Sequence, residues 1–570
     1  MKYDIVIKNG LIVDGTGKEK YHGDIGIIGE KIERVGLIDH LEATRFIDAK
    51  GKIVCPGFID PHSHADVSIM FYPDNEACIM QGVTTFIGGN CGDSSAPVGE
   101  YWDAKALDLE KIKGVIPSYY TWYNSPIKRD DVVRQAWTQY NLDLDYKSFE
   151  EFCEKLDKYK ISTNYYPLIG HGNLRSIVMR GDISREASFD EIREMKTLLR
   201  SALQAGAKGI STGLDYPPGA FASIEELISL AQVVKEFDGI YATHIRGRKL
   251  FVTGEGGYDP ERGLIEAFQI AETTGVSVHI SHLIMIKSPE YTKSLFDNAR
   301  KKGIKVTYDV IANTTAGGGS FPFLAFILKP WYLTAGSPEQ FEKNLNDKDY
   351  VDAMKKDMGS SKWYFANHES LPGVEEAILI TKCKNSSYIN KTVKQIMEER
   401  DWSYADTLIN IAKSDALTKI KYGAPSKEEE HNNIKALFDY PWSMPSSDGF
   451  AVNHDSKFGF AEPFCFYPHQ NSFNYAVRYL QRYQNHSLEE TIRKATGLVA
   501  ETFKIKGRGT IAEKKYADIL IYDPEQLNCN ESPFDTRTYP KGVLYVLVNG
   551  AIVLDNGVQT GSRPGKVLKI

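Results

Sequence analysis

Between residues 57 and 449 the chain alternates short β-branched or aromatic segments with helical ones, and this alternation constrains the fold most strongly. Eight candidate strands follow one another, at residues 57–64, 84–92, 163–172, 207–214, 239–246, 276–282, 305–311 and 442–449. Segments with apolar residues at helical spacing lie between several of them, as at 189–206 and 223–237. Strands that alternate with helices form parallel βα units, and eight such units close into a barrel. The sequence therefore predicts an α/β fold built on a (β/α)8 TIM barrel.

The two ends of the chain depart from this alternation and resemble each other. Residues 1–55 and 505–570 contain short strands separated by turns, and Asn-Gly-Leu-Ile-Val near the start matches Asn-Gly-Ala-Ile-Val near the end. We expect both ends to form one small β-sandwich domain; two separate β appendages are the alternative. The barrel then spans residues 56–504. Two insertions, at about 99–160 and 325–438, follow strands two and seven and should lie at the catalytic face.

The composition fits a folded protein and argues against several functions. Hydrophobic residues make up 42% and charged residues 25% of the chain, as in soluble domains. A net charge of −7 disfavours binding to nucleic acid, and no apolar run approaches the roughly 18 residues that span a membrane. The start lacks the features of a secretory signal, and the seven scattered cysteines form no CxxC pair. We therefore expect a cytoplasmic protein acting on small molecules, and a homo-oligomer is compatible with this composition.

Side chains that bind metals follow five of the eight predicted strands. They are His62 and His64 after the first strand, Cys91 after the second, His244 after the fifth, His282 after the sixth and Asp448 after the eighth. Each alone has an ordinary structural explanation, such as a buried histidine or a turn-forming aspartate. Active sites of these barrels lie at the carboxyl ends of the strands, so closure of the barrel brings all six together. The joint pattern predicts a metal centre.

Zinc suits a mixed set of thiolate, imidazole and carboxylate ligands. Bound zinc would lower the pKa of a water toward about 7 and polarise a carbonyl group. We expect Asp448 to accept the proton of that water and return it to the leaving nitrogen, which predicts a hydrolase of a C–N amide bond. A dipeptidase or a cyclic-amide hydrolase would use the same attack. A non-catalytic scaffold that kept the barrel is the alternative from another class.

Several motifs resemble the D-aminoacylase (N-acyl-D-amino-acid deacylase) family of the amidohydrolase superfamily, over almost the whole chain. They include PGFIDPHSHAD, GNCG, STGL, THIR, SSDG and ATGLVAETF. The resemblance implies a tight zinc site formed by Cys91, His244 and His282. It implies a second, often weakly filled metal site at His62 and His64. It also implies that Asp448 is the catalytic aspartate and that the substrate is an N-acyl-D-amino acid or a related compound.

Three segments that face the substrate in that family differ in this chain. The family's SHHK, YPY and HPR correspond here to SHLI at 281–284, DVIAN at 309–313 and HQN at 469–471. Asn471 thus replaces an arginine that would hold a substrate carboxylate, and asparagine lacks both its charge and its planar fork. Arg246 and Lys287 could hold an anion from another direction. Asn313 and Asn471 are the remaining candidate substrate contacts.

Overall fold

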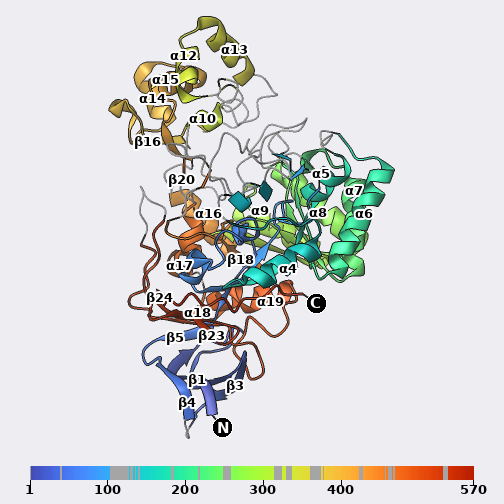
Figure 1. Ribbon diagram of the computed structural model, residues 1–570, viewed down its shortest axis with the longest axis vertical. Helices are drawn as coiled ribbons and strands as arrows, with labels where there is room; N and C mark the ends of the chain where they lie inside the picture. Colours follow the sequence, from blue (N-terminus) through green and yellow to red (C-terminus); the bar gives the residue numbers. More distant parts are fainter. Residues whose placement is uncertain are drawn as a thin grey trace.

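The structure is a computed structural model, and its three regions follow one another along the long axis of the molecule (Figure 1). It describes residues 2–38, 42–99, 101–102, 127–128, 133–134, 136–138, 141–180, 185–215, 218–247, 259–313, 324–328, 331, 335, 337–359, 374–376, 378–422, 428–455, 458–459, 465–466, 469–484, 486–530 and 537–569. Strands from both chain ends lie at one end of the molecule, the helix-wrapped barrel lies in the middle, and a helical segment projects at the other end. Among these residues no helix is long and apolar enough to cross a membrane.

The strands of the two chain ends join in one sheet system, which forms the β-sandwich. They are β1 (Lys2–Ile12), β2 (Tyr21–Ile28), β3 (Lys31–Gly36), β4 (Glu42–Asp48), β5 (Ile53–Pro56), β21 (Ile519–Tyr522), β22 (Val543–Val548), β23 (Ala551–Asp555) and β24 (Val558–Gln559). The order is β24-β23-β22-β21-β5-β1-β2-β3, and β4 pairs with β1 as well. The long strand β1 pairs with β4 through its first half and with β5 at its end. Isoleucines from both ends, such as Ile7 and Ile519, share one buried core.

The barrel wall contains parallel strands at all eight predicted positions. These are β6 (Phe58–Asp60), β7 (Val83–Gly88), β10 (Asn164–Pro167) with β11 (Ile169–Gly170), β12 (Gly209–Gly213), β13 (Ile240–His244), β14 (Ser277–Ile280), β15 (Val306–Ile311) and β18 (Ser443–Ser446). One sheet has the order β6-β7-β10, and the other runs from β11 through β15 to β18. A parallel bridge between Ser63 and Gly449 joins the last strand to the first and closes the barrel. The prediction of a TIM barrel with a β-sandwich from both termini is confirmed.

Two predicted strands are shorter or more broken than their sequence pattern indicates. β6 ends at Asp60, so His62 and His64 lie in the loop beyond it, on either side of the Ser63 bridge. Pro61 has no N–H group to continue the ladder. The third wall strand is interrupted at Leu168, where its pairing changes from β7 to β12. Both interruptions occur next to a proline.

Helices with clear sequence signals cover the outside of the barrel (Figure 1). They are α4 (Phe149–Tyr159), α5 (His171–Val178), α6 (Phe189–Gln204), α7 (Ile224–Glu236), α8 (Pro260–Thr274), α9 (Pro289–Lys301), α16 (Glu428–Phe438), α17 (Asn471–Arg482), α18 (Leu488–Ala495) and α19 (Gly497–Thr502). The predicted helices 189–206 and 223–237 correspond to α6 and α7. The Ser188 and Ser223 side chains cap these two helices by accepting N–H groups of the first turn.

The second predicted insertion carries a hydrophobic core of its own. It contains α10 (Leu324–Ile327), α12 (Pro338–Asn344), α13 (Lys348–Met358), β16 (Ile378–Lys382), α14 (Val393–Arg400), α15 (Tyr404–Ser414) and β17 (Lys419–Tyr422). Buried residues from Leu324 to Ile420 form a cluster separate from the barrel core, and this segment lies at the top of Figure 1. The helix α16 that follows packs instead against α9, β15 and β18.

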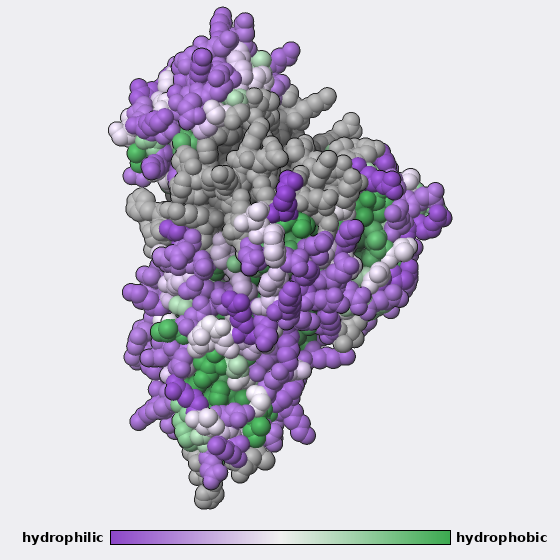
Figure 2. Space-filling view, in the orientation of Figure 1, coloured by the Kyte–Doolittle hydropathy of each residue, from purple (hydrophilic) through white to green (hydrophobic). Residues whose placement is uncertain are grey.

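The first predicted insertion is described only in part. Side chains of residues 101–132 lie outside the described residues. The described end of the insertion contains α4, whose buried face includes Phe149, Phe152 and Leu156 and joins the main barrel core. The exact domain limits at 55, 56, 504 and 505 stay a prediction. On the surface, Figure 2 shows apolar patches over the sandwich end, where Leu37 and Phe46 are among the exposed apolar side chains.

Candidate metal centre

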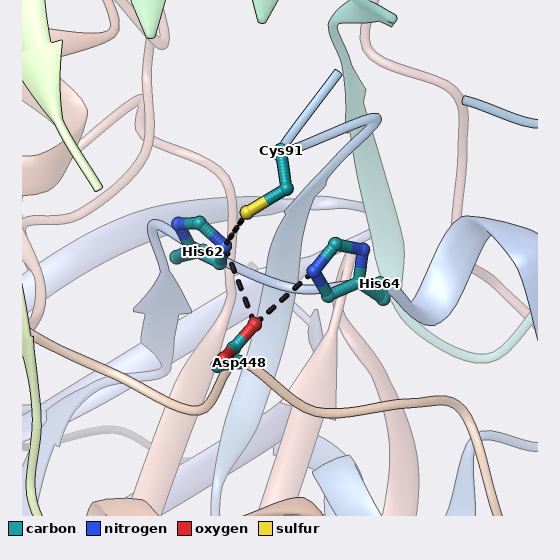
Figure 3. Close-up of side chains that lie close together, drawn as sticks. All are labelled: His62, His64, Cys91 and Asp448. Atoms are coloured by element: carbon teal, nitrogen blue, oxygen red, sulfur yellow. Dashed lines mark hydrogen bonds and ion pairs between the residues drawn. The ribbon is translucent and has the colours of Figure 1, made fainter. Parts of the chain in front are cut away.

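The five side chains predicted as metal ligands and the predicted catalytic Asp448 converge at the carboxyl ends of the barrel strands. Figure 3 shows four of them, which we call the first group: His62, His64, Cys91 and Asp448. One Asp448 carboxylate oxygen lies 3.1 Å from His64 Nε2 and 3.4 Å from His62 Nε2. The Cys91 sulfur lies 3.3 Å from His62 Nε2 on the other side. The donor atoms of this group all lie within 4.8 Å of one another, and every residue in it is buried.

A second group shares Cys91 with the first and adds His244 and His282. The Cys91 sulfur lies 3.3 Å from His282 Nε2 and 3.8 Å from His244 Nδ1. The two imidazole rings meet edge to face, with centroids 4.6 Å apart. Because one sulfur belongs to both groups, the centre offers two adjacent sets of ligands joined by a single thiol.

Backbone hydrogen bonds explain why residues 62–64 and 448 meet although nearly 400 positions separate them in the sequence. The Asp448 N–H donates to the His62 carbonyl over 2.9 Å, and the His64 N–H donates to the Gly449 carbonyl over 2.7 Å. The Ser63 hydroxyl also donates to Gly449 O over 3.1 Å. These bonds, together with the Ser63–Gly449 bridge, join the first and last strands of the barrel beyond the ends of β6 and β18. Closure of the barrel itself therefore assembles the first group.

Three of these six site residues adopt a backbone conformation that non-glycine residues rarely use. The φ angles are 54° at Cys91, 35° at His282 and 49° at Asp448. Left-handed conformations of such residues cost about 1–3 kcal/mol each and cluster at functional sites, where the surrounding structure enforces them. The side chains of these three residues all belong to the cluster of donor atoms.

The charges of the centre favour the ionised forms of its thiol and its carboxylate. Burial alone would raise the pKa of the Cys91 thiol, but the charges of His62 and His282 and hydrogen bonds with His244 and His282 hold it well below its usual value. Burial would also raise the pKa of Asp448, and hydrogen bonds with His62 and His64 keep that pKa below the usual carboxyl range. Ionised sulfur and oxygen are the forms that bind metal.

These residues fit a zinc ion in both geometry and chemistry. With Zn–S near 2.3 Å and Zn–N near 2.0 Å, a tetrahedral site holds sulfur and nitrogen about 3.5 Å apart. The distances from Cys91 sulfur to the His62, His244 and His282 nitrogens are 3.3, 3.8 and 3.3 Å. The separation of the donors and the mix of thiolate, imidazole and carboxylate therefore both match the requirements of zinc.

Sequence reasoning missed the buried carboxylates behind these ligands. Asp309 lies 3.4 Å from His62 Nδ1, and Asp215 lies 3.8 Å from His244 Nε2. Asp60 accepts the N–H groups of His62 and Ser447. Carboxylates in such places orient metal-binding imidazoles. The usable signal was a charged residue inside an otherwise apolar strand, as in Thr-Tyr-Asp-Val-Ile around Asp309.

The two cationic candidates for substrate binding have protein partners. The Arg246 guanidinium donates to both Glu266 carboxylate oxygens over 3.0 Å and to the carbonyl groups of Ala220 and Ala222. Lys287 is exposed and pairs with Glu261. A substrate anion would have to replace these contacts, which makes both residues weaker candidates than their charges alone indicate.

The two asparagine candidates contact each other beside the metal centre. Asn313 Nδ2 donates to Asn471 Oδ1 over 3.0 Å, and an Arg478 N–H donates to the same oxygen over 3.0 Å. These two donors fix the orientation of the Asn471 amide. Among the residues that the structure describes, its buried Nδ2 group has no hydrogen-bond partner. Ser472, the next residue, packs against Gly449, so Asn471 lies close to the Asp448 turn.

The closed barrel and its buried set of thiol, imidazoles and carboxylate define a metal-dependent hydrolase. The amidohydrolase family model matches residues 45–326 of this chain. The chain is thus similar to the amidohydrolase family over almost half of its length.

Within that family the similarity to one kind of enzyme extends over the whole length. The chain is 27% identical to N-acyl-D-glutamate deacylase of Alcaligenes xylosoxydans xylosoxydans, covering 100% of this chain and 97% of the relative. A crystal structure of D-aminoacylase aligns with a TM-score of 0.72 and 27% identity over 100% of both chains. N-acyl-D-glutamate deacylase of Bordetella bronchiseptica, solved with zinc and a phosphonate inhibitor, aligns with a TM-score of 0.71 and 25% identity over 100% of both chains. The predicted resemblance to the D-aminoacylases is confirmed.

Proposed function

We propose that this enzyme uses zinc to hydrolyse the amide bond of an N-acyl-D-amino acid or a closely related N-acyl compound. The observation that carries the proposal is the buried cluster of Cys91, four imidazoles and Asp448 at the carboxyl ends of the strands. Full-length similarity to an N-acyl-D-glutamate deacylase and to D-aminoacylase supports the choice of substrate class. A cytoplasmic location and a homo-oligomer stay predictions.

The roles of the residues follow from their positions. Cys91, His244 and His282 would hold a tightly bound zinc ion, and His62 and His64 would complete a second, weaker site around the shared thiolate. Bound zinc supplies a Lewis acid that activates water and polarises the amide carbonyl.

Asp448 would move the proton during the reaction. Its carboxylate is ionised and lies between His62 and His64, where an attacking water would be held. It accepts the proton of that water and donates it to the nitrogen that leaves. Burial of the centre excludes bulk water, which strengthens each of these electrostatic interactions.

Asn471 is the best-supported substrate contact among the four candidates. Because Asn313 and Arg478 both donate to its oxygen, its amide N–H group is left to donate to an oxygen of the substrate. An amide N–H group can donate a hydrogen bond to a carboxylate or to a neutral carbonyl group. A dipeptide, a cyclic amide or an amino acid amide is therefore a second candidate substrate.

The first experiment combines zinc content with a substrate panel. Purified enzyme would be tested on N-acetyl-D- and N-acetyl-L-amino acids, their uncharged carboxamides, dipeptides and cyclic amides. One or two zinc ions per chain with release of a D-amino acid supports the proposal. Zinc with turnover only of neutral or cyclic amides would move the function to the second candidate. Zinc without turnover of any amide would favour a non-catalytic scaffold.

Two variants locate the substrate contact. Asn471→Ala should raise KM about 3- to 10-fold, the effect of one lost hydrogen bond, with little change in zinc content. Lys287→Gln is the control, since this lysine is exposed and already paired with Glu261, and its KM should stay near that of the wild type. Equal KM values for the two variants would remove Asn471 from the substrate site.

A further inference from the structure

Asp309 is a fully buried carboxylate that lies beside both donor groups and belongs to neither. It sits in β15, between β14 and β18. β14 leads to His282, and β18 leads to Asp448. Its two oxygens point to different partners, and these partners belong to different parts of the metal centre.

One oxygen of Asp309 faces two imidazoles. Oδ2 lies 3.0 Å from His279 Nε2 and 3.4 Å from His62 Nδ1. In the neutral imidazole that would bind a metal, a carboxylate beside Nδ1 of His62 favours the tautomer with its proton on that nitrogen. The lone pair of His62 then lies on Nε2, which is the atom that faces Cys91 and Asp448. This oxygen therefore sets the donor atom of the first group.

The other oxygen of Asp309 holds the backbone of the second group. Oδ1 accepts the His282 N–H over 2.9 Å and the Ser446 hydroxyl. The carbonyl of Asp309 accepts the N–H of Leu283, the residue after His282, over 2.8 Å. His282 has the strained φ of 35°, and these two bonds fix the peptide groups on both sides of it.

A purely structural role does not require a charge at this position. A neutral side chain such as asparagine could accept the Ser446 hydroxyl and the His282 N–H, whereas burying a carboxylate carries a large desolvation penalty. The charge is useful only toward the imidazoles. His279 is held by Thr307 as well, at 2.8 Å through Nδ1, which leaves His62 as the imidazole whose orientation depends on the carboxylate.

We propose that Asp309 is a positioning residue that links the two halves of the metal centre: one oxygen orients His62 and the other fixes the backbone of His282. This inference rests on the proposed function only in assuming that both groups bind metal. It identifies a single side chain whose loss weakens both sites together.

Metal binding by Asp309→Asn, measured without substrate, tests the link. The asparagine keeps an acceptor for His282 and Ser446 but turns an N–H donor toward His62. Zinc affinity, measured by competition with a chelator, should fall about 10- to 100-fold, and the absorption spectrum of the cobalt-substituted protein should change. Thr307→Val is the matched control: it lies on the same strand, and its hydroxyl group forms a hydrogen bond with His279. Its zinc affinity and cobalt spectrum should match the wild type.

The role of Asp309 at His282 is tested in a protein that lacks the imidazoles of His62 and His64. In a His62→Ala/His64→Ala background the metal site of Cys91, His244 and His282 remains. Adding Asp309→Ala, which removes the acceptor of the His282 N–H, should weaken cobalt binding there by a further factor of about 10. Unchanged affinity in this background would overturn the link between the two halves.

A further variant covers the case in which Asp309→Asn does not fold. Asp309→Glu keeps the charge and moves it by one methylene, so its cobalt spectrum should still differ from the wild type. A wild-type spectrum in this variant would overturn the proposal. Wild-type protein that binds zinc but hydrolyses no amide would overturn the proposed function and leave the outcome for Asp309 unaffected.

Discussion

The two donor groups of the metal centre are built in different ways. His62, His64 and Asp448 come from the first and last wall strands, which are neighbours joined by backbone hydrogen bonds. His244 and His282 come from strands five and six, and Cys91 reaches them from strand two, with left-handed backbone at Cys91 and His282.

The difference shows two routes by which one fold gathers ligands. The first group depends on local pairing at the seam of the barrel, so a substitution there should change chemistry more than geometry. The second group depends on residues from three separate strands that the closed barrel and Asp309 hold in place. Substitutions there, and above all at the shared Cys91, should remove the metal itself.

Cys91→Ala should have the largest effect. This thiolate is common to both groups, so its loss leaves each of them without its sulfur donor. Zinc content should fall to near zero, with an affinity loss larger than the roughly 10- to 100-fold caused by residues behind a ligand. Hydrolysis should fall with it. Cys153→Ala, a buried thiol in α4, is the control and should retain zinc. Full zinc content in Cys91→Ala would contradict the description of the centre as two donor groups joined by this thiolate.

Asp448→Asn should separate chemistry from metal binding. The amide cannot accept a proton from water, so kcat should fall about 100- to 10,000-fold, while the second group keeps its zinc. Steady-state kinetics and elemental analysis of the same preparation check both points. Turnover near that of the wild type would exclude Asp448 as the proton acceptor.

His64→Gln should affect only the weaker site. His64 belongs to the first group alone, and its ring is held by the Asp448 carboxylate at 3.1 Å. Titration with zinc should show one tightly bound ion and no second one. Loss of all zinc in this variant would mean that the two groups cannot be treated as separate sites.

The site residues that could be predicted from the sequence are those that follow a strand of the repeating βα unit. Each donor from His62 to Asp448 follows a strand, and the eightfold alternation places the strand ends at one face. Asp309 gave no such signal, because its role depends on neighbours in β14 and β18 that become adjacent only in the barrel. The orientation of the Asn471 amide likewise depends on Asn313 and Arg478, which no spacing rule connects to it.

For Arg246, in the motif THIR, the sequence analysis overestimated a candidate. Its charge indicated a site for a substrate anion, and its surroundings do not favour that role. The sequence could not show that Glu266 and two carbonyl groups take up its guanidinium. The separate core of the second insertion was also beyond sequence reasoning, since helical periodicity shows an apolar face but not what it packs against.

The smallest effect on the metal centre is expected at a buried charge cluster behind strand three. Glu226 accepts a hydrogen bond from His171 Nε2 at 2.7 Å and also forms an ion pair with Arg175. All three side chains are fully buried. Glu226→Gln should leave zinc content and kcat near wild type. It should lower the free energy of unfolding at pH 7 by about 3 kcal/mol, because the buried Arg175 guanidinium loses its carboxylate partner.

The direction in which this loss of unfolding free energy changes with pH can also be predicted and measured. Burial would raise the pKa of Glu226, but the hydrogen bond and charge of His171 and the charge of Arg175 hold it below its usual value. A folded-state pKa below the unfolded one gives stability that is complete above the unfolded pKa, about 4.3, and is lost as pH falls through the folded pKa. The difference between wild type and Glu226→Gln in urea unfolding should therefore shrink below pH 4. A difference that stays constant into acid would show that shape, and not charge, makes this cluster stabilising.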